Sequence, residues 1–115
     1  MLKEQMEKAL NGQINAELYS SYLYLSMASH FETMNLKGFA NWMMIQAQEE
    51  DSHAMKLYHY VHERGGKVSL TAIEGPPTEW SSPLELFEAV YKHECHVSDL
   101  INKPVDLSIE LSAHA

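Results

Sequence analysis

Four residues able to bind a metal ion occupy equivalent positions in three segments of the sequence. Glu50 and His53 form a Glu-x-x-His motif within a long amphipathic helical pattern, Glu17 lies in the helical pattern before it, and Glu94 lies in one after it. Each falls on the apolar face of its own predicted helix, where burying an uncompensated carboxylate costs several kcal/mol. Because a cation between the helices removes that cost, the pattern indicates a metal site.

The donor atoms restrict which metal this site would bind. Carboxylate oxygens with a single imidazole suit iron or manganese and leave zinc possible, whereas thiolate-rich sites favour zinc or copper. Glutamates from separate helices combined with Glu-x-x-His are typical of di-iron carboxylate bundles, so a di-iron centre is the leading hypothesis. In the alternative interpretation, Glu17, Glu50 and Glu94 are half-exposed residues that pair with lysine or solvent.

The hydrophobic pattern predicts two long helices that would position these residues. Residues 2–34 contain no proline, and Gly12 is the one residue that weakens their helical pattern. Residues 37–64 predict a second helix that ends at Gly65 and Gly66, a C-terminal glycine signal. The connection between the two helices is so short that they are expected to be antiparallel neighbours.

The following segment predicts a crossover to a third helix. Residues 65–82 include Gly75-Pro76-Pro77 and are long enough, when extended, to travel the length of a helix. Such a crossover makes the helices on either side of it parallel. Ser82-Pro83-Leu84-Glu85 is a capping box with proline at the first helical position, so it starts a third helix that we expect over residues 83–103.

Each predicted helix has a seam whose residues recur in alternating steps of four and three. A stripe of small residues beside the second seam favours close helix approach, and a second apolar stripe on the first helix favours packing against a neighbouring subunit. The seams are Met6, Leu10, Gln13, Glu17, Ser20, Tyr24, Met27 and Phe31; Phe39, Met43, Gln46, Glu50, His53, Leu57 and Tyr60; and Leu84, Phe87, Tyr91, Glu94, Ser98 and Ile101. The small-residue stripe is Ala40, Ala47, Ala54 and Val61, and the second apolar stripe is Ile14, Leu18, Tyr22 and Leu25.

Composition excludes several classes of protein. The 115 residues are 45% hydrophobic, which can support a single compact core. Together with the helical patterns, this predicts one all-α domain over residues 1–115. With 16 acidic and 8 basic residues, the net charge of −8 argues against binding to nucleic acid or anionic membranes. No apolar run approaches the roughly 20 residues of a membrane span, and no secretory signal is visible, so we expect a cytoplasmic protein.

Cys95 is expected to be a reduced thiol, and His93 and His96 to be solvated surface residues.

Longer motifs in the same segments resemble bacterial-type non-heme ferritin, a family of ferritin-like di-iron proteins. The likeness covers about residues 1–102 and is carried by Asn15-Ala16-Glu17-Leu18-Tyr19-Ser20-Ser21-Tyr22-Leu23-Tyr24-Leu25, Gly38-Phe39-Ala40-Asn41-Trp42-Met43, Gln46-Ala47-Gln48-Glu49-Glu50-Asp51-Ser52-His53-Ala54, Arg64-Gly65-Gly66-Lys67-Val68, Pro76-Pro77-Thr78-Glu79-Trp80 and Phe87-Glu88-Ala89 to His93-Glu94. The resemblance implies iron storage by four-helix subunits that assemble into a hollow cage of 24 chains. It also implies that dioxygen oxidises Fe(II) at an intrasubunit ferroxidase centre, after which Fe(III) forms an oxide mineral inside the cage.

The resemblance also implies roles for individual residues. Glu17, Glu50 and His53 would bind the first iron, with Glu50 bridging, and Glu94 would hold the second. Two further residues match positions near the centre. Glu49 matches a ligand of an accessory third iron site, and Tyr24 would donate a hydrogen bond beside the centre and act as a possible electron source.

The sequence departs from the ferritin pattern at its C-terminal end. Family members continue into a fourth long helix that supplies a further glutamate and a nearby glutamine or glutamate, whereas this sequence ends at Ala115. Pro104 also falls inside the expected third helix, at a cost of about 3 kcal/mol. These features predict a bundle truncated before its fourth helix, with an open apolar groove. Either another chain fills that groove, or the sequence is a truncated relative or a fragment. Two alternatives to the ferroxidase remain: a noncatalytic structural or assembly subunit that binds iron weakly, and a manganese or zinc carboxylate protein.

Overall fold

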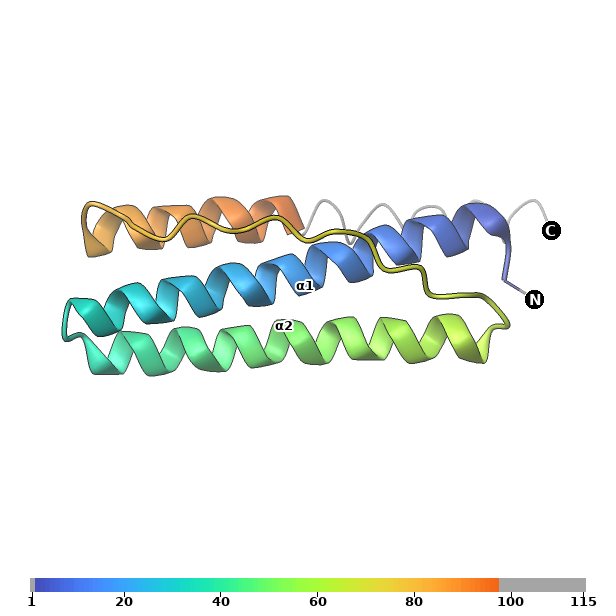
Figure 1. Cartoon of the computed structure of the whole chain (residues 1–115), viewed down its shortest axis with the longest axis horizontal. Coiled ribbons are helices and arrows are strands. Elements are labelled where there is room, and N and C mark those ends of the chain that lie inside the picture. The colour runs from blue at the N-terminus through green and yellow to red at the C-terminus, as the bar shows by residue number, and fades with distance from the viewer. Residues whose placement is uncertain (1, 98–115) are drawn as a thin grey trace.

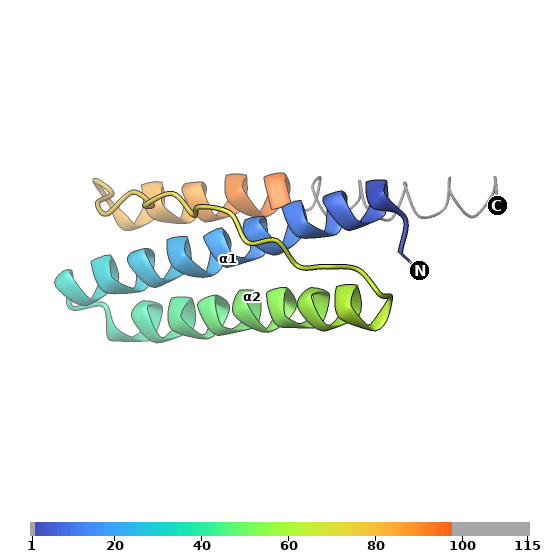
Figure 2. The same cartoon turned by 45° about the vertical axis from the view of Figure 1, so that its right-hand side comes forward.

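Long helices packed side by side make up the protein. The computed structural model describes residues 2–97, in which helix α1 spans Glu4–Thr33 and helix α2 spans Lys37–Glu63. Residues 83–97 are also helical, and no strand is found among residues 2–97. The predicted all-α, ferritin-like bundle is therefore confirmed (Figures 1 and 2). The expected extension of the third helix to residue 103, with Ser98 and Ile101 of its seam, and Pro104 lie outside the described residues.

Helices α1 and α2 end in turns of the same type. In each turn, backbone amides beyond the helix donate hydrogen bonds to carbonyls of its last turn. After α1, Asn35 has a φ of 59° and the amide of Leu36 donates back into the helix over 3.0 Å. After α2, Gly65 has a φ of 77° and the amide of Gly66 donates back over 2.9 Å. The first turn reverses the chain, so α1 and α2 are antiparallel (Figure 1).

The segment between α2 and the third helix lies along α1. The side chain of Asn11 donates to the carbonyl of Lys67 over 2.9 Å, and further along α1 the Ser26 hydroxyl donates to the carbonyl of Pro77 over 2.6 Å. Both the segment and α1 therefore advance in the same direction, and the chain returns to the end of the bundle where α2 began (Figure 1). The helix over residues 83–97 consequently runs parallel to α2, as the predicted crossover requires.

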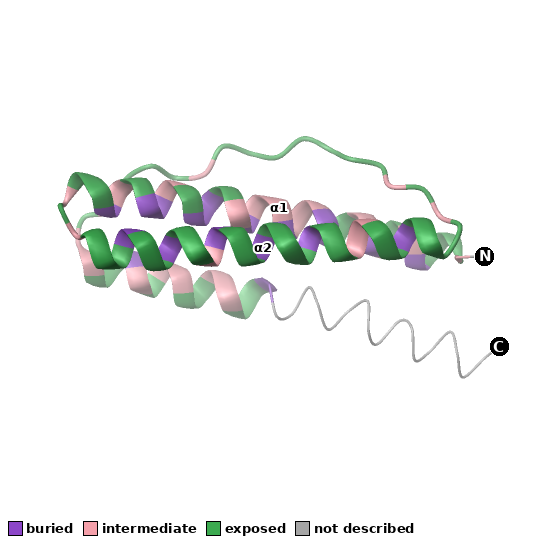
Figure 3. Ribbon diagram, turned by 90° about the horizontal axis from the view of Figure 1, so that it is seen from below, coloured by how far each residue is buried: buried purple, intermediate pink, exposed green. Residues whose placement is uncertain are grey.

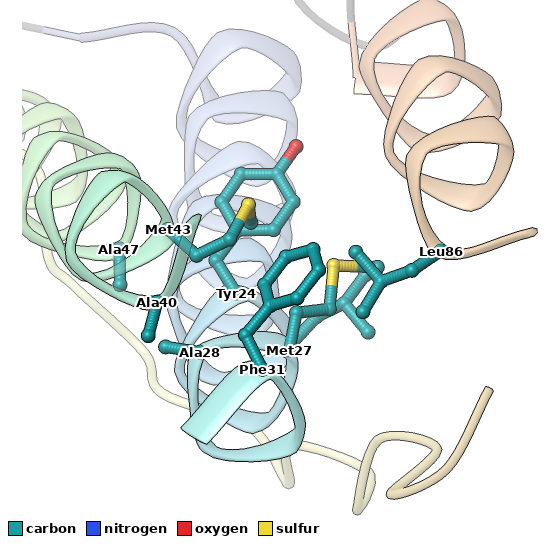
Figure 4. Packing of buried hydrophobic residues seen from close by; sticks show 9 residues of the cluster. Tyr24, Met27, Ala28, Phe31, Ala40, Met43, Ala47 and Leu86 are labelled. Carbon is teal, nitrogen blue, oxygen red and sulfur yellow. The ribbon is translucent and has the colours of Figure 1, made fainter. Parts of the chain in front are cut away.

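Two hydrophobic clusters hold the bundle together, one on each side of a polar layer. The first joins the second half of α1, the first half of α2 and the third helix: Leu23, Tyr24, Met27, Ala28, Phe31, Ala40, Met43, Ala47 and Leu86 (Figure 4). The second joins the start of α1 to the end of α2: Met6, Leu10, Ile14 and Val61. The polar layer contains Gln13, Glu17, Ser20 and Glu50, which are all buried.

The seam predicted for α1 is confirmed, because all eight of its residues are buried. On α2, the small-residue stripe of Ala40, Ala47, Ala54 and Val61 is buried, as are Met43 and Glu50 of the predicted seam, while Phe39, His53 and Tyr60 of that seam are exposed. Figure 3 shows buried and exposed positions alternating along α2. Small side chains allow the two helix backbones to approach closely, so the alanines of α2 lie in the core together with Met43.

The seam predicted for the third helix was wrong in part. Leu84 and Tyr91 are 68% and 73% exposed, whereas Leu86 is completely buried in the first hydrophobic cluster. The helix is therefore rotated relative to the prediction, whose seam did not include Leu86. No helix within residues 2–97 is long and apolar enough to cross a membrane.

Alanine substitutions at two glycines are expected to change the free energy of unfolding in opposite directions. Gly65→Ala is expected to lower the free energy of unfolding by roughly 1–2 kcal/mol, because alanine is strained at positive φ. Gly12→Ala is expected to raise it by about 0.5–1 kcal/mol, because Gly12 lies inside α1 and an added Cβ meets nothing within 4 Å. Urea unfolding followed by circular dichroism measures both, and a loss of stability in Gly12→Ala would contradict this account.

Candidate metal centre

The polar layer brings three of the predicted ligands together. Glu17 comes from α1, and Glu50 and His53 come from α2, which is antiparallel to it. His53 Nδ1 lies 3.7 Å from Glu17 Oε2 and 3.6 Å from Glu50 Oε2. One ligand atom from each residue lies within 4.8 Å of the others, which is a group that could hold a metal ion. The Glu-x-x-His spacing places its two side chains on the same face of α2.

Glu17 and Glu50 each have a buried carboxylate oxygen that no hydrogen bond satisfies. Glu17 Oε2 and Glu50 Oε2 are both buried and have no hydrogen-bond partner. A buried acceptor without a partner costs about 1–3 kcal/mol, and more when it is charged. A hard cation satisfies both oxygens at once, and oxygen donors with one imidazole are suited to iron. The residues present therefore fit a bound metal ion better than they fit a closed polar core.

Burial and neighbouring charge perturb the acid at the centre of this group. Burial and the adjacent Glu17 carboxylate, with smaller contributions from Glu94 and Glu49, raise the pKa of Glu50 to about 9. Burial also raises the pKa of Tyr24 well above its ordinary value, as does its hydrogen bond to Glu94. Without a cation, Glu50 is therefore protonated at neutral pH.

Glu94 and Glu49 lie apart from the three grouped ligands. Glu94 is half-buried on the third helix, where its Oε1 accepts a hydrogen bond from the Tyr24 hydroxyl. Glu49 is exposed beside Glu50 on α2. The structure thus brings Tyr24 to Glu94, but the group whose ligand atoms could share one ion consists of Glu17, Glu50 and His53.

Two contacts to this layer were not predicted from the sequence. Gln13 donates from Nε2 to Glu17 Oε1 over 2.8 Å. Its position on the polar part of the α1 seam was a sequence signal that could have indicated this contact. His93 was expected to be a solvated surface residue, which is wrong. It is half-buried, its Nε2 lies 2.7 Å from the Ser20 hydroxyl, and its ring packs edge-on to Tyr24. Burial lowers the pKa of His93.

Comparison with known proteins identifies the class to which this fold and site belong. Residues 7–115 match the family model for the ferritin-like domain, and the chain belongs to the ferritin family. The bacterial non-heme ferritin of Bacteroides fragilis is 46% identical over 108 residues, which are 94% of this chain and 68% of that protein. The bacterial non-heme ferritin of Campylobacter jejuni is 38% identical over 106 residues, which are 92% of this chain and 64% of that protein.

Solved structures support the same assignment. The open pore ferritin from the hyperthermophilic archaeon Archaeoglobus fulgidus is 54% identical and superposes with a TM-score of 0.95. The match covers 99% of this chain and 70% of that chain. The resemblance to non-heme ferritin proposed from the sequence motifs is therefore confirmed.

The perturbed Glu50 predicts how the metal-free protein responds to pH. Between the ordinary pKa of 4.5 and about 9, the folded protein keeps a proton on Glu50 that the unfolded chain has released. Stability should therefore fall as pH rises through this range, and Glu50→Gln should reduce that slope and be more stable than the wild type at the alkaline end. Urea unfolding at several pH values with a chelator tests this. Glu63→Gln, at the exposed end of α2, serves as the control that keeps the slope, and an unchanged slope in Glu50→Gln would contradict the assignment.

Proposed function

We propose that this chain binds Fe(II) as a substrate at Glu17, Glu50 and His53 and that dioxygen oxidises it there to Fe(III), as a step in iron storage. Each Fe(II) gives up one electron, and dioxygen accepts the electrons together with protons. The observation that carries the proposal is the pair of buried, unpartnered carboxylate oxygens of Glu17 and Glu50 facing one imidazole. Membership of the ferritin family and the similarity to bacterial non-heme ferritins favour iron over other hard cations.

A second iron would be held by Glu94, with Glu50 bridging the two ions. Tyr24 would orient Glu94, since its hydroxyl donates to that carboxylate, and could supply an electron. Glu49 would bind an accessory third ion, a role that its exposed place beside Glu50 permits. In these assignments, Glu50 would be a ligand of both ions.

We further propose that the chain acts as a homo-oligomer in the cytoplasm, in a cage of 24 chains as the family resemblance implies. Tyr22 and Leu25, on the second apolar stripe of α1, are exposed within the described chain. Apolar side chains gathered on one helix face are typical of subunit contacts. Ile14 of the same stripe is buried in the second hydrophobic cluster, so a neighbouring chain would cover Tyr22 and Leu25.

A noncatalytic structural or assembly subunit is the second candidate function. It is favoured by the position of Glu94, which is bonded to Tyr24 and does not belong to the three-ligand group. A chain that binds one ion weakly would then have the ferritin fold without rapid oxidation. Manganese or zinc binding is a weaker alternative that the same measurement tests.

The decisive experiment is an anaerobic titration of the purified chain with Fe(II), followed by exposure to oxygen. Light scattering on the same sample gives the mass of the assembly. Saturable binding followed by oxidation faster than in buffer, within a large assembly, is the expected result. Weak binding with oxidation no faster than in buffer would support the structural subunit. Tight binding of Mn(II) or Zn(II) in a parallel titration, with Fe(II) oxidised no faster than in buffer, would overturn the iron assignment.

Glu50→Ala is expected to reduce oxygen-dependent Fe(II) oxidation to the rate in buffer, because it removes a carboxylate facing His53 and the proposed bridge between the two ions. Assembly should be largely unchanged, since Glu50 lies in the polar layer between the two hydrophobic clusters. Asp51→Ala is the matched control, because it removes an exposed carboxylate from the next position of α2. Stopped-flow absorbance measures both rates, and a wild-type rate in Glu50→Ala would remove this residue from the mechanism.

Tyr24→Phe is expected to slow oxidation by about 10- to 100-fold while leaving the binding of the first ion unchanged, because the substitution releases Glu94 but not the three grouped ligands. Tyr91→Phe, at an exposed position of the third helix, should have no effect. Anaerobic Fe(II) titration separates binding from rate. Weaker binding of the first ion in Tyr24→Phe would contradict the assignment of Tyr24 to the second ion.

A further inference from the structure

The two oxygens of the Glu17 carboxylate have different surroundings. Oε1 accepts a hydrogen bond from the Gln13 side-chain amide over 2.8 Å, and both residues are buried, with 5% and 1% of their surfaces exposed. Oε2 has no hydrogen-bond partner and lies 3.7 Å from His53 Nδ1. One oxygen is therefore held by the protein, and the other faces the metal site.

Gln13 is an unusual residue at this position unless it serves Glu17. It lies one helical turn before Glu17 on the same face of α1, close in the sequence to Leu10 and Ile14 of the second hydrophobic cluster. Burying an amide costs free energy unless it is hydrogen-bonded. An apolar side chain would extend the cluster, whereas glutamine supplies an N–H donor, and hydrogen bonds to an ionised acceptor are among the strong ones.

We propose that Gln13 is a positioning residue for the metal site: it holds Oε1 so that Glu17 offers a single oxygen, Oε2, to the ion shared with Glu50 and His53. This inference rests on the proposed function at the same site. Restricting Glu17 to one oxygen leaves more of the ion's coordination sphere for the Glu50 carboxylate and for the imidazole. Without the amide, Glu17 is free to rotate and to bind the ion through both oxygens.

The test is a titration of the full, metal-free chain with Co(II), whose visible absorption weakens as its coordination number rises. Gln13→Met, which has similar length but no donor, should bind Co(II) about 10- to 100-fold more weakly than the wild type, the usual effect of removing a partner of a metal ligand. Its spectrum at saturating Co(II) should also differ from that of the wild type. Gln5→Met, at an exposed position of the same helix, should change neither quantity.

A merely structural role for Gln13 predicts a different result. It would weaken binding without changing the saturated spectrum, and that outcome overturns the proposal, as does an unchanged affinity. If Gln13→Met does not form helix by circular dichroism, Gln13→Asn carries the test, because it keeps the amide but is one methylene too short to reach Glu17. Its spectrum should differ from the wild type in the same way.

Co(II) binding does not depend on ferroxidase activity, so the two proposals fail separately. A wild-type chain that binds Co(II) at this site but does not oxidise Fe(II) would remove the proposed function and leave the role of Gln13 intact. A wild-type chain that binds and oxidises Fe(II) while Gln13→Met behaves identically would overturn only the role of Gln13. A wild-type chain that oxidises Fe(II) but does not bind Co(II) would overturn the role proposed for Gln13 and leave the proposed function standing.

Discussion

The structure depends on holding two carboxylates against each other inside a helical bundle. Glu17 and Glu50 face each other across α1 and α2, and each has a buried oxygen without a hydrogen-bond partner. Left to themselves, such groups would separate or take up protons. The hydrophobic clusters on either side of the polar layer prevent separation, because moving the helices apart would expose both clusters to water. The packing free energy of the bundle therefore supports an unfavourable arrangement that a bound cation would relieve.

The relative height of the ligands follows from features far from the site. The turn at Asn35 fixes where α2 begins relative to α1, and the alanine stripe lets the two helices approach closely along their length. Because α2 is antiparallel to α1, a residue in the middle of one helix meets the middle of the other. The Glu-x-x-His motif on α2 consequently reaches Glu17 without any contribution from a loop.

Sequence periodicity predicted the helices and the α1 seam well, since α1 packs against α2, the crossover segment and the third helix and so buries most of one face. It predicted α2 and the third helix less well. Periodicity shows which residues share a face but not how much of that face a neighbour covers, so Phe39, Tyr91 and His53 are exposed although they recur at seam positions. The partners of Gln13 and His93 were also beyond prediction, because hydrogen bonds depend on side-chain directions that spacing does not define.

Helix α1 supplies hydrogen-bond donors to two of the three glutamates Glu17, Glu50 and Glu94. Gln13 donates to Glu17, and Tyr24 donates to Glu94. No such donor reaches Glu50 Oε2, and Glu50 is the acid whose pKa rises to about 9. At neutral pH a metal ion must displace the proton of Glu50 before this carboxylate can bind it, so ion binding and proton release are linked at this residue. The same burial that raises the pKa of Glu50 makes its ionised form costly in the metal-free protein, and a cation bound beside it would remove that cost.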